Sequence, residues 1–144
     1  MKLFNLFKPK SRIQVTTDLG IFTLLNNKTQ PIWSTLKENR LLSVHGTLTE
    51  PAPDQLSFIK QLDNELKKLD AAITAKFIEL FTESNLTAEF THWHQRFTLT
   101  AVAVEVIIKE KVSWSITFED HQDSFAHFNL YIKDNKVIDL SIDT

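Results

Sequence analysis

The sequence of 144 residues contains no cysteine, so disulfide bonds, thiolate metal sites and a cysteine nucleophile are excluded. Its two glycines and four prolines leave no flexible linker and no glycine-rich phosphate loop. No stretch approaches the roughly 20 apolar residues of a membrane span. Residues 1–8 lack the long apolar run and the cleavage site of a signal peptide. We therefore expect a cytoplasmic protein with a single domain over residues 1–144.

Neither sign of charge dominates the chain, because 16 Lys and Arg residues face 18 Asp and Glu residues. This balance gives no reason to expect nucleic-acid binding. The distribution is uneven, however. Residues 1–12 form a basic segment without acidic residues, whereas residues 115–144 carry an excess of carboxylates. Such an acidic bias is typical of solvated turns, and it also suits a docking face for a basic partner.

The first residues combine Phe4, Leu6 and Phe7 with lysines at positions 2, 8 and 10. This pattern is compatible with a short amphipathic helix on a membrane surface, although such a short helix would bind weakly. A terminal segment of this kind more often packs on its domain or frays. We therefore expect no membrane attachment.

Strand patterns occupy residues 13–50. Ile13, Val15 and Thr17 alternate with polar residues, and the turn Asp18-Leu19-Gly20 leads into a second apolar run, which predicts a hairpin. Two further strands are predicted at 31–36 and 41–48, with a bulge at Gly46.

The pattern then changes to that of one long amphipathic helix over residues 53–84. Pro53 suits the first helical position and Asp54 suits the positive end of the helix dipole. Apolar residues recur every three or four positions for about seven turns. A helix of this length is unusual in a small domain, so we expect a kink or break near residues 68–70.

After an ambiguous stretch at 86–97, where 86–90 could form a short helix, the alternation of strands returns. A C-terminal β-meander is predicted over 98–142, with short turns that imply antiparallel pairing. The predicted fold is therefore α+β, in which antiparallel strands flank one long central helix that packs on the sheet. Eleven phenylalanines, together with Trp33, Trp93 and Trp114, supply residues for the core or for a partner-facing surface.

The motif His92-Trp93-His94 is a candidate metal site. On a strand the two imidazoles would face the same way, and His121, His127 or an acidic neighbour could supply a third ligand. The alternative is a surface or capping pair around a buried Trp93, which we favour because the motif alone is weakly specific. No metal or cofactor is therefore expected.

A second candidate comprises Asp120, Asp123 and His127, which could perform acid–base chemistry, with Ser124 as a nucleophile. A catalytic triad also needs an oxyanion hole and a sharp turn around the serine, and no such pattern is present. We therefore interpret this stretch as a polar turn between two strands and expect a protein that is not an enzyme.

Three stretches together carry a family resemblance. They are the hairpin Asp18-Leu19-Gly20-Ile21-Phe22 followed by a strand around Trp33, the segment Pro51-Ala52-Pro53-Asp54-Gln55-Leu56 that leads into the long helix, and the strands 114–120 and 125–132. This pattern resembles the small bacterial domains of unknown function that recur beside polymorphic toxins, many of which act as immunity proteins. The chain differs from the pattern in having Ala126 where a glycine often precedes the histidine.

The resemblance implies an α+β fold and an immunity protein that neutralises a cognate bacterial toxin, with a basic surface, by direct binding. Acidic residues would then steer the complex together, and the expected contact residues are Glu119, Asp120, Asp123 and Asp139. Two alternatives remain open, namely a structural or interaction domain without a toxin and an enzyme with a site built on histidines. The oligomeric state is not indicated.

Overall fold

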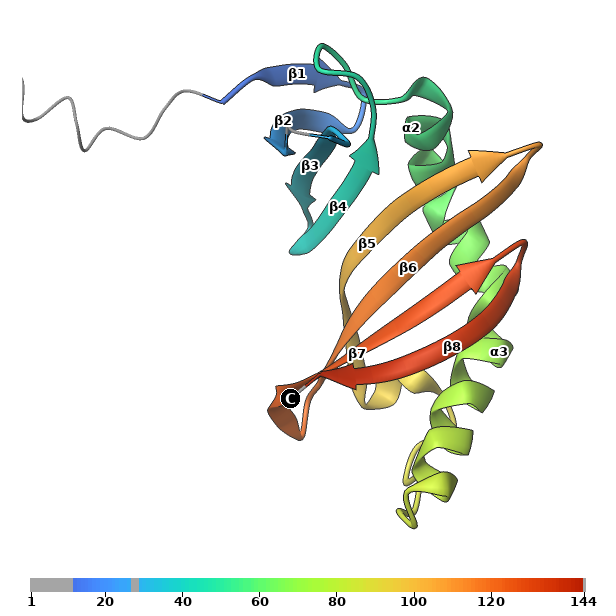
Figure 1. Cartoon of the computed structure of the whole chain (residues 1–144). Helices are drawn as coiled ribbons and strands as arrows, with labels where there is room; N and C mark the ends of the chain where they lie inside the picture. Colours follow the sequence, from blue (N-terminus) through green and yellow to red (C-terminus); the bar gives the residue numbers. More distant parts are fainter. Residues whose placement is uncertain (1–11, 27–28, 144) are drawn as a thin grey trace, which may run out of the picture.

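The computed structural model describes residues 12–26 and 29–143, which form one eight-stranded sheet with two α-helices on one face (Figure 1). The strands lie side by side in the order in which they occur along the chain. The fold is thus α+β, as predicted, and the apolar residues at positions 4, 6 and 7 lie outside the described residues. The elements are β1 (Gln14–Thr17), β2 (Gly20–Asn26), β3 (Ile32–Lys37), β4 (Arg40–His45), α2 (Pro53–Lys60), α3 (Leu62–Glu83), the 3-10 turn η1 (Trp93–Gln95), β5 (Phe97–Ile108), β6 (Lys111–Asp120), β7 (Asp123–Lys133) and β8 (Lys136–Asp143).

One pair of neighbouring strands is parallel. β4 and β5 pair in the same direction through residues 41–43 and 101–103, whereas the other neighbouring pairs are antiparallel. The expectation of antiparallel pairing is therefore wrong at this position. β4 and β5 can be parallel because a long connection through α2 and α3 joins them. A parallel pair requires such a crossover, whereas short turns produce antiparallel pairs.

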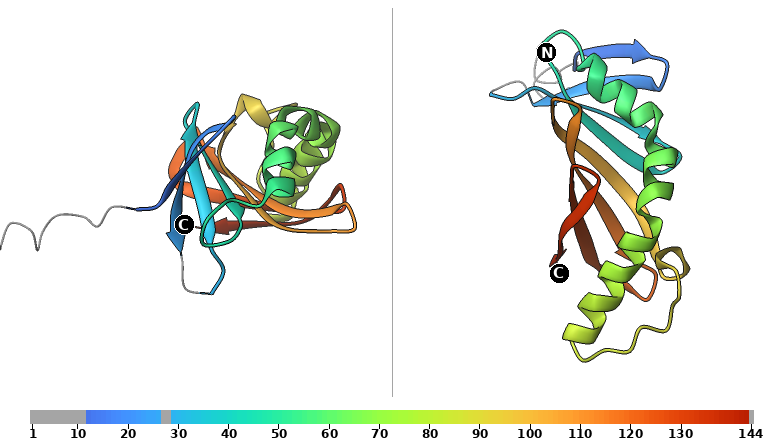
Figure 2. Two further views of the ribbon diagram at one scale, coloured as in Figure 1. Left: turned by 90° about the horizontal axis from the view of Figure 1, so that it is seen from above. Right: turned by 90° about the vertical axis from the view of Figure 1, so that its right-hand side faces the viewer.

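The sheet is strongly bent. In the view from above in Figure 2, β1–β4 stand at a steep angle to β5–β8, and the helices lie in the angle between the two halves. The buried side chains of both halves point into this angle and form one hydrophobic cluster with the helices. The opposite face of β5–β8 carries no helix among the described residues (Figure 1).

Phe77 of α3 lies at the centre of the core and is completely buried. Its ring stacks on that of Phe97 with the centroids 4.0 Å apart, and it meets Phe118 and Phe128 edge-on at 5.2 and 5.5 Å. Such aromatic pairs each contribute about 0.5–1.5 kcal/mol beyond their buried area. A single cluster of phenylalanines therefore attaches α3 to β5, β6 and β7.

The long helix is divided, but not where the sequence suggested. Its break lies at Gln61, whose backbone (φ −97°, ψ 8°) leaves the helical region, and residues 68–70 remain helical. Glutamine is not a helix breaker, so local propensity does not mark this position. The break separates α2, which contacts β4 and β5, from α3, which reaches β8, so each helix follows a different part of the bent sheet.

The end of α3 lies where it was predicted, but the loop that follows differs from the expectation. Asn85 adopts a left-handed conformation (φ 56°), and the N–H of Leu86 donates to the carbonyl of Phe81 at 2.8 Å, which ends the helix where the sequence predicts. Residues 86–90 form no helix. The chain has no regular structure from 86 to 90, bends at 91–92, where His92 itself is extended, and then makes the turn η1.

Candidate functional site

The four carboxylates predicted to meet a partner do not share one environment. Glu119 and Asp139 are exposed on strands β6 and β8, and Asp123 is exposed at the start of β7. Asp120 is buried, with only 5% of its surface accessible. The expectation that all four are surface carboxylates is therefore wrong for Asp120.

The negative charge of Asp120 is balanced inside the protein by Arg96. Its two carboxylate oxygens accept hydrogen bonds from Nε and Nη2 of Arg96 at 3.0 and 2.9 Å, and the N–H of Gln122 donates to Oδ1 at 2.9 Å. Burial opposes ionisation, but the hydrogen bonds and the charge of Arg96 outweigh it and lower the pKa of Asp120 below its ordinary value. Asp120 thus connects the end of β6 to the start of β5.

The remaining members of the second candidate site are not brought together. Oδ1 of Asp123 accepts a hydrogen bond from the N–H of Phe125 at 3.1 Å, which is a local turn contact. His127 instead faces Glu119, with Nδ1 of the imidazole 4.0 Å from the carboxylate. Ser124 is exposed, and the described residues place no hydrogen-bonded histidine beside it.

The face of β5–β8 that points away from the helices is polar. Strand pairing places Thr117, Asn129 and Ser141 in one row across β6, β7 and β8. The hydroxyl of Thr117 donates to Asn129 at 2.9 Å, and the amide of Asn129 donates to Asp143 at 2.7 Å. These hydrogen bonds fix the side chains of an exposed face, which provides a rigid polar surface.

This open face contains a hollow of about 440 Å³ near the turn between β7 and β8. Two acidic residues, Glu105 and Asp139, line it together with Tyr131, which lies directly opposite Asp139 in the strand register. The hollow is also lined by Ser113, Trp114, Ile132, Lys133 and Ile138.

Sequence reasoning missed Glu105 and Tyr131. The reason is a β-bulge between Tyr131 and Ile132 in the pairing with β8, which sets Asp139 rather than Ile138 opposite Tyr131. A second bulge between Val104 and Val106 in β5 includes Glu105. Regular alternation contains no signal for either shift.

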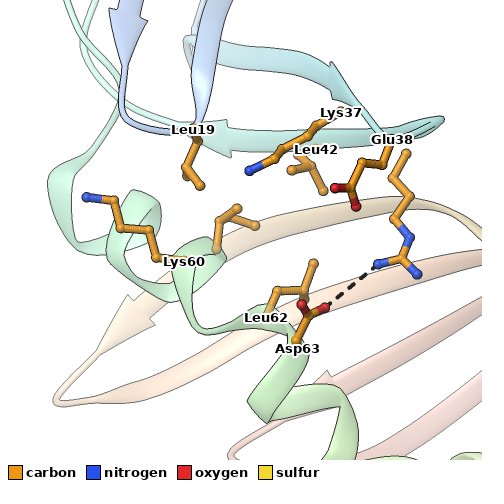
Figure 3. A pocket seen from close by; sticks show the side chains of 9 residues that line it. Leu19, Lys37, Glu38, Leu42, Lys60, Leu62 and Asp63 are labelled. Atoms are coloured by element: carbon orange, nitrogen blue, oxygen red, sulfur yellow. Dashed lines mark ion pairs between the residues drawn. The ribbon is translucent and has the colours of Figure 1, made fainter.

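Another pocket, of about 150 Å³, lies between β1–β4 and the helix break (Figure 3). Leu42 and Leu62 contribute apolar surface, and charges of both signs surround it, including Lys37, Glu38 and Lys60. One Asp63 oxygen lies 3.9 Å from Arg40 Nη1, and this ion pair crosses from β4 to α3. The small volume and the paired charges indicate a packing junction rather than a ligand site.

The motif at 92–94 lies against α3. His92 is still extended when η1 begins, so the rings of His92 and His94 come to the same side with their centroids 5.1 Å apart. The neighbouring acidic residue is Asp70, whose Oδ2 is 3.6 Å from Nδ1 of His92. Trp93 is half-buried rather than buried, and its ring meets that of Phe118 edge-on at 5.1 Å.

Comparisons with protein families, curated proteins and solved structures find no match to this chain. None of the described helices combines the length and the apolar composition that a membrane crossing requires.

Proposed function

We propose that this protein is a non-catalytic immunity or inhibitor protein of the cytoplasm that neutralises a cognate bacterial toxin by direct binding. The resemblance described above suggests this class. The observation that carries the proposal is the open face of β5–β8, which is rigid and polar, has carboxylates at its edges and is covered by none of the helices of residues 12–26 and 29–143.

The charge of this face suits a basic partner. Glu105, Glu119, Asp139 and Asp143 are exposed on it or at its ends. The opposing charges are those of Lys133 on β7 and Lys136, its exposed register partner on β8, so carboxylates remain in excess. An excess of carboxylates raises the rate at which a basic protein approaches, and it raises affinity less.

The hollow at Glu105 and Asp139 would anchor the partner. Two carboxylates beside an aromatic ring are the surroundings that an arginine or lysine side chain favours, because charge, hydrogen bonds and the ring face all contribute. Anchors of this kind, in a recess near other contacts, supply most of the binding energy of protein complexes. Glu119 and Asp123 lie nearer the other end of the strands, where we expect them to steer the approach.

The first experiment is purification of the tagged protein from its native cell. We expect one basic protein at near-stoichiometric amount. That partner should arrest growth when it is expressed alone, and co-expression of this chain should restore growth. A partner that is harmless alone would contradict the immunity function and favour an interaction domain without a toxin.

The docking face is tested with the purified pair. The double variant Glu105→Lys, Asp139→Lys should weaken binding by at least about tenfold, because each change reverses a charge at the anchor. Glu119→Lys should mainly slow association. The matched control is Glu83→Lys, Glu89→Lys, which alters the net charge equally at exposed positions at and beyond the end of α3. Equal losses in both double variants would show that net charge, not this face, determines binding.

A further inference from the structure

Asp70, His92 and His94 form a cluster that the proposed docking function does not use. It lies on the helix-bearing side of the sheet, between α3 and η1. One ligand atom from each of the three side chains falls within 4.8 Å of the other two. All three are accessible, since both histidines are exposed and Asp70 is half-buried.

We propose that Asp70, His92 and His94 bind one divalent transition-metal ion of the class that imidazole favours, with Zn²⁺ as the reference ion. Two imidazoles and one carboxylate are a common ligand set for zinc, which leaves a fourth position for water or for a group from another molecule. No metal was expected because the His92-Trp93-His94 motif alone is weakly specific, but the fold brings a carboxylate of α3, that of Asp70, to the two histidines.

The distances suit this ion. Ligand atoms around tetrahedral zinc are roughly 3.3 Å apart, given metal–ligand distances near 2.0–2.1 Å. Asp70 Oδ2 and His92 Nδ1 are already 3.6 Å apart. The side chain of His94 is exposed, its ring lies beside that of His92, and its ligand atom is within 4.8 Å of the other two.

The surroundings hold Asp70 in the orientation that a ligand requires. The indole N–H of Trp93 donates to Asp70 Oδ1 at 2.6 Å, which leaves Oδ2 turned towards His92. The backbone N–H of Trp93 also donates to the hydroxyl of Thr74, one turn further along α3, at 3.2 Å. Such outer contacts fix the ligands of metal sites and raise their affinity.

Binding would connect η1 to α3 through the ion. The loop that precedes η1 contains no regular structure between residues 86 and 92. A ligand that binds only the folded state adds stability in proportion to its affinity and concentration. The metal would therefore stabilise the end of this loop.

The test is calorimetric titration of the untagged full chain with ZnCl₂ in a non-coordinating buffer. We expect saturable binding of one ion per chain. His92→Gln, His94→Gln and Asp70→Asn should each weaken it by about tenfold or more. Asp70→Asn retains an oxygen that can accept the Trp93 hydrogen bond, so its loss of affinity is separable from misfolding, which circular dichroism would reveal.

The matched control is His127→Gln, because His127 also faces a carboxylate, that of Glu119, at 4.0 Å. This variant should bind Zn²⁺ as the wild type does. As a second measurement, Cu²⁺ should quench part of the total tryptophan fluorescence of the wild type, through Trp93 beside the site, and much less of it in His94→Gln. A dissociation constant above about 1 mM, or equal weakening by His127→Gln, would overturn the proposal.

Discussion

Arg96 and Asp120 form a two-point ion pair that connects the residue before β5 to the last residue of β6, with N–O distances of 3.0 and 2.9 Å. The guanidinium also lies 4.7 Å from the centre of the Phe81 ring. The side chain of Asp120 is 3% exposed and that of Arg96 is 20% exposed. This pair is therefore shielded from solvent far more than the other ion pairs of the described residues.

Replacing Asp120 with asparagine should lower the free energy of unfolding by about 2–3 kcal/mol, because Arg96 would remain partly buried without a counter-charge. Urea denaturation measures the change. The control is Asp18→Asn, which removes an exposed ion pair at 2.9 Å from Lys60 and should cost much less. Similar losses in both variants would show that burial does not strengthen the Arg96–Asp120 pair.

The ionised carboxylate of Asp120 should also make the stability of the protein depend on pH in the acid range. The pKa of Asp120 in the folded protein lies below the ordinary value of 3.8. Its stabilising contribution is therefore complete above that value and is lost as the pH falls through the folded-state pKa. Urea denaturation at neutral pH and at about pH 3 should show the wild type and Asp120→Asn becoming more alike in acid. A constant difference between them would contradict this assignment.

The turn between β5 and β6 contains unfavourable residues. Lys109 and Glu110 both have positive φ, at 51° and 67°. Two-residue hairpins with this geometry favour Asn-Gly. Lys109→Asn with Glu110→Gly should therefore raise the free energy of unfolding by about 1–2 kcal/mol.

Thermal denaturation would measure this gain. The same exchange at Asp134-Asn135, which already contains asparagine and has φ values of 51° and 61°, should stabilise the protein less. No gain at 109–110 would indicate that the present side chains contribute contacts of comparable value.

Gly46 is required by a close approach of two backbone segments. A β-carbon at this position would lie 2.2 Å from the carbonyl oxygen of Glu50 and 2.7 Å from the α-carbon of Pro51. Gly46→Ala should therefore destabilise the protein by about 3 kcal/mol, as measured by urea denaturation. The neighbouring exchange Ser43→Ala, on a regular part of β4, is the control and should have a smaller effect.

The sequence predicted the elements of this fold well where one periodic pattern determined them. The hairpin with its turn at Asp18-Leu19-Gly20 and the end of α3 near Asn85 are confirmed, and strands fill the predicted meander region 98–142, the first of them beginning at Phe97. The break at Gln61 and the parallel pair β4–β5 could not be predicted. The break comes at a residue that is not a helix breaker, and the parallel pair follows from the crossover through α2 and α3, whose packing no local pattern encodes.

The candidate sites show a similar division. Alternation places Glu119 and Asp139 on the outer face and Asp120 on the inner face with Trp114, Ile116 and Phe118, but it cannot show that Asp120 meets Arg96, 24 positions away. It also cannot bring Asp70 to His92 and His94, because their approach depends on how α3 packs against η1. The β-bulge beside Tyr131 is likewise absent from the alternation pattern of the sequence.

The parallel pairing of β4 and β5 has a consequence for how the molecule assembles. Hairpins such as β3–β4 and β5–β6 join residues near each other in the chain, whereas Leu41 and Ala101 are about 60 positions apart. Joining them requires closure of a long loop, with an entropy cost that local contacts do not offset. The two halves of the sheet can thus acquire local order separately, but they become one cooperative structure only when the helices bring β5 to the edge of β4.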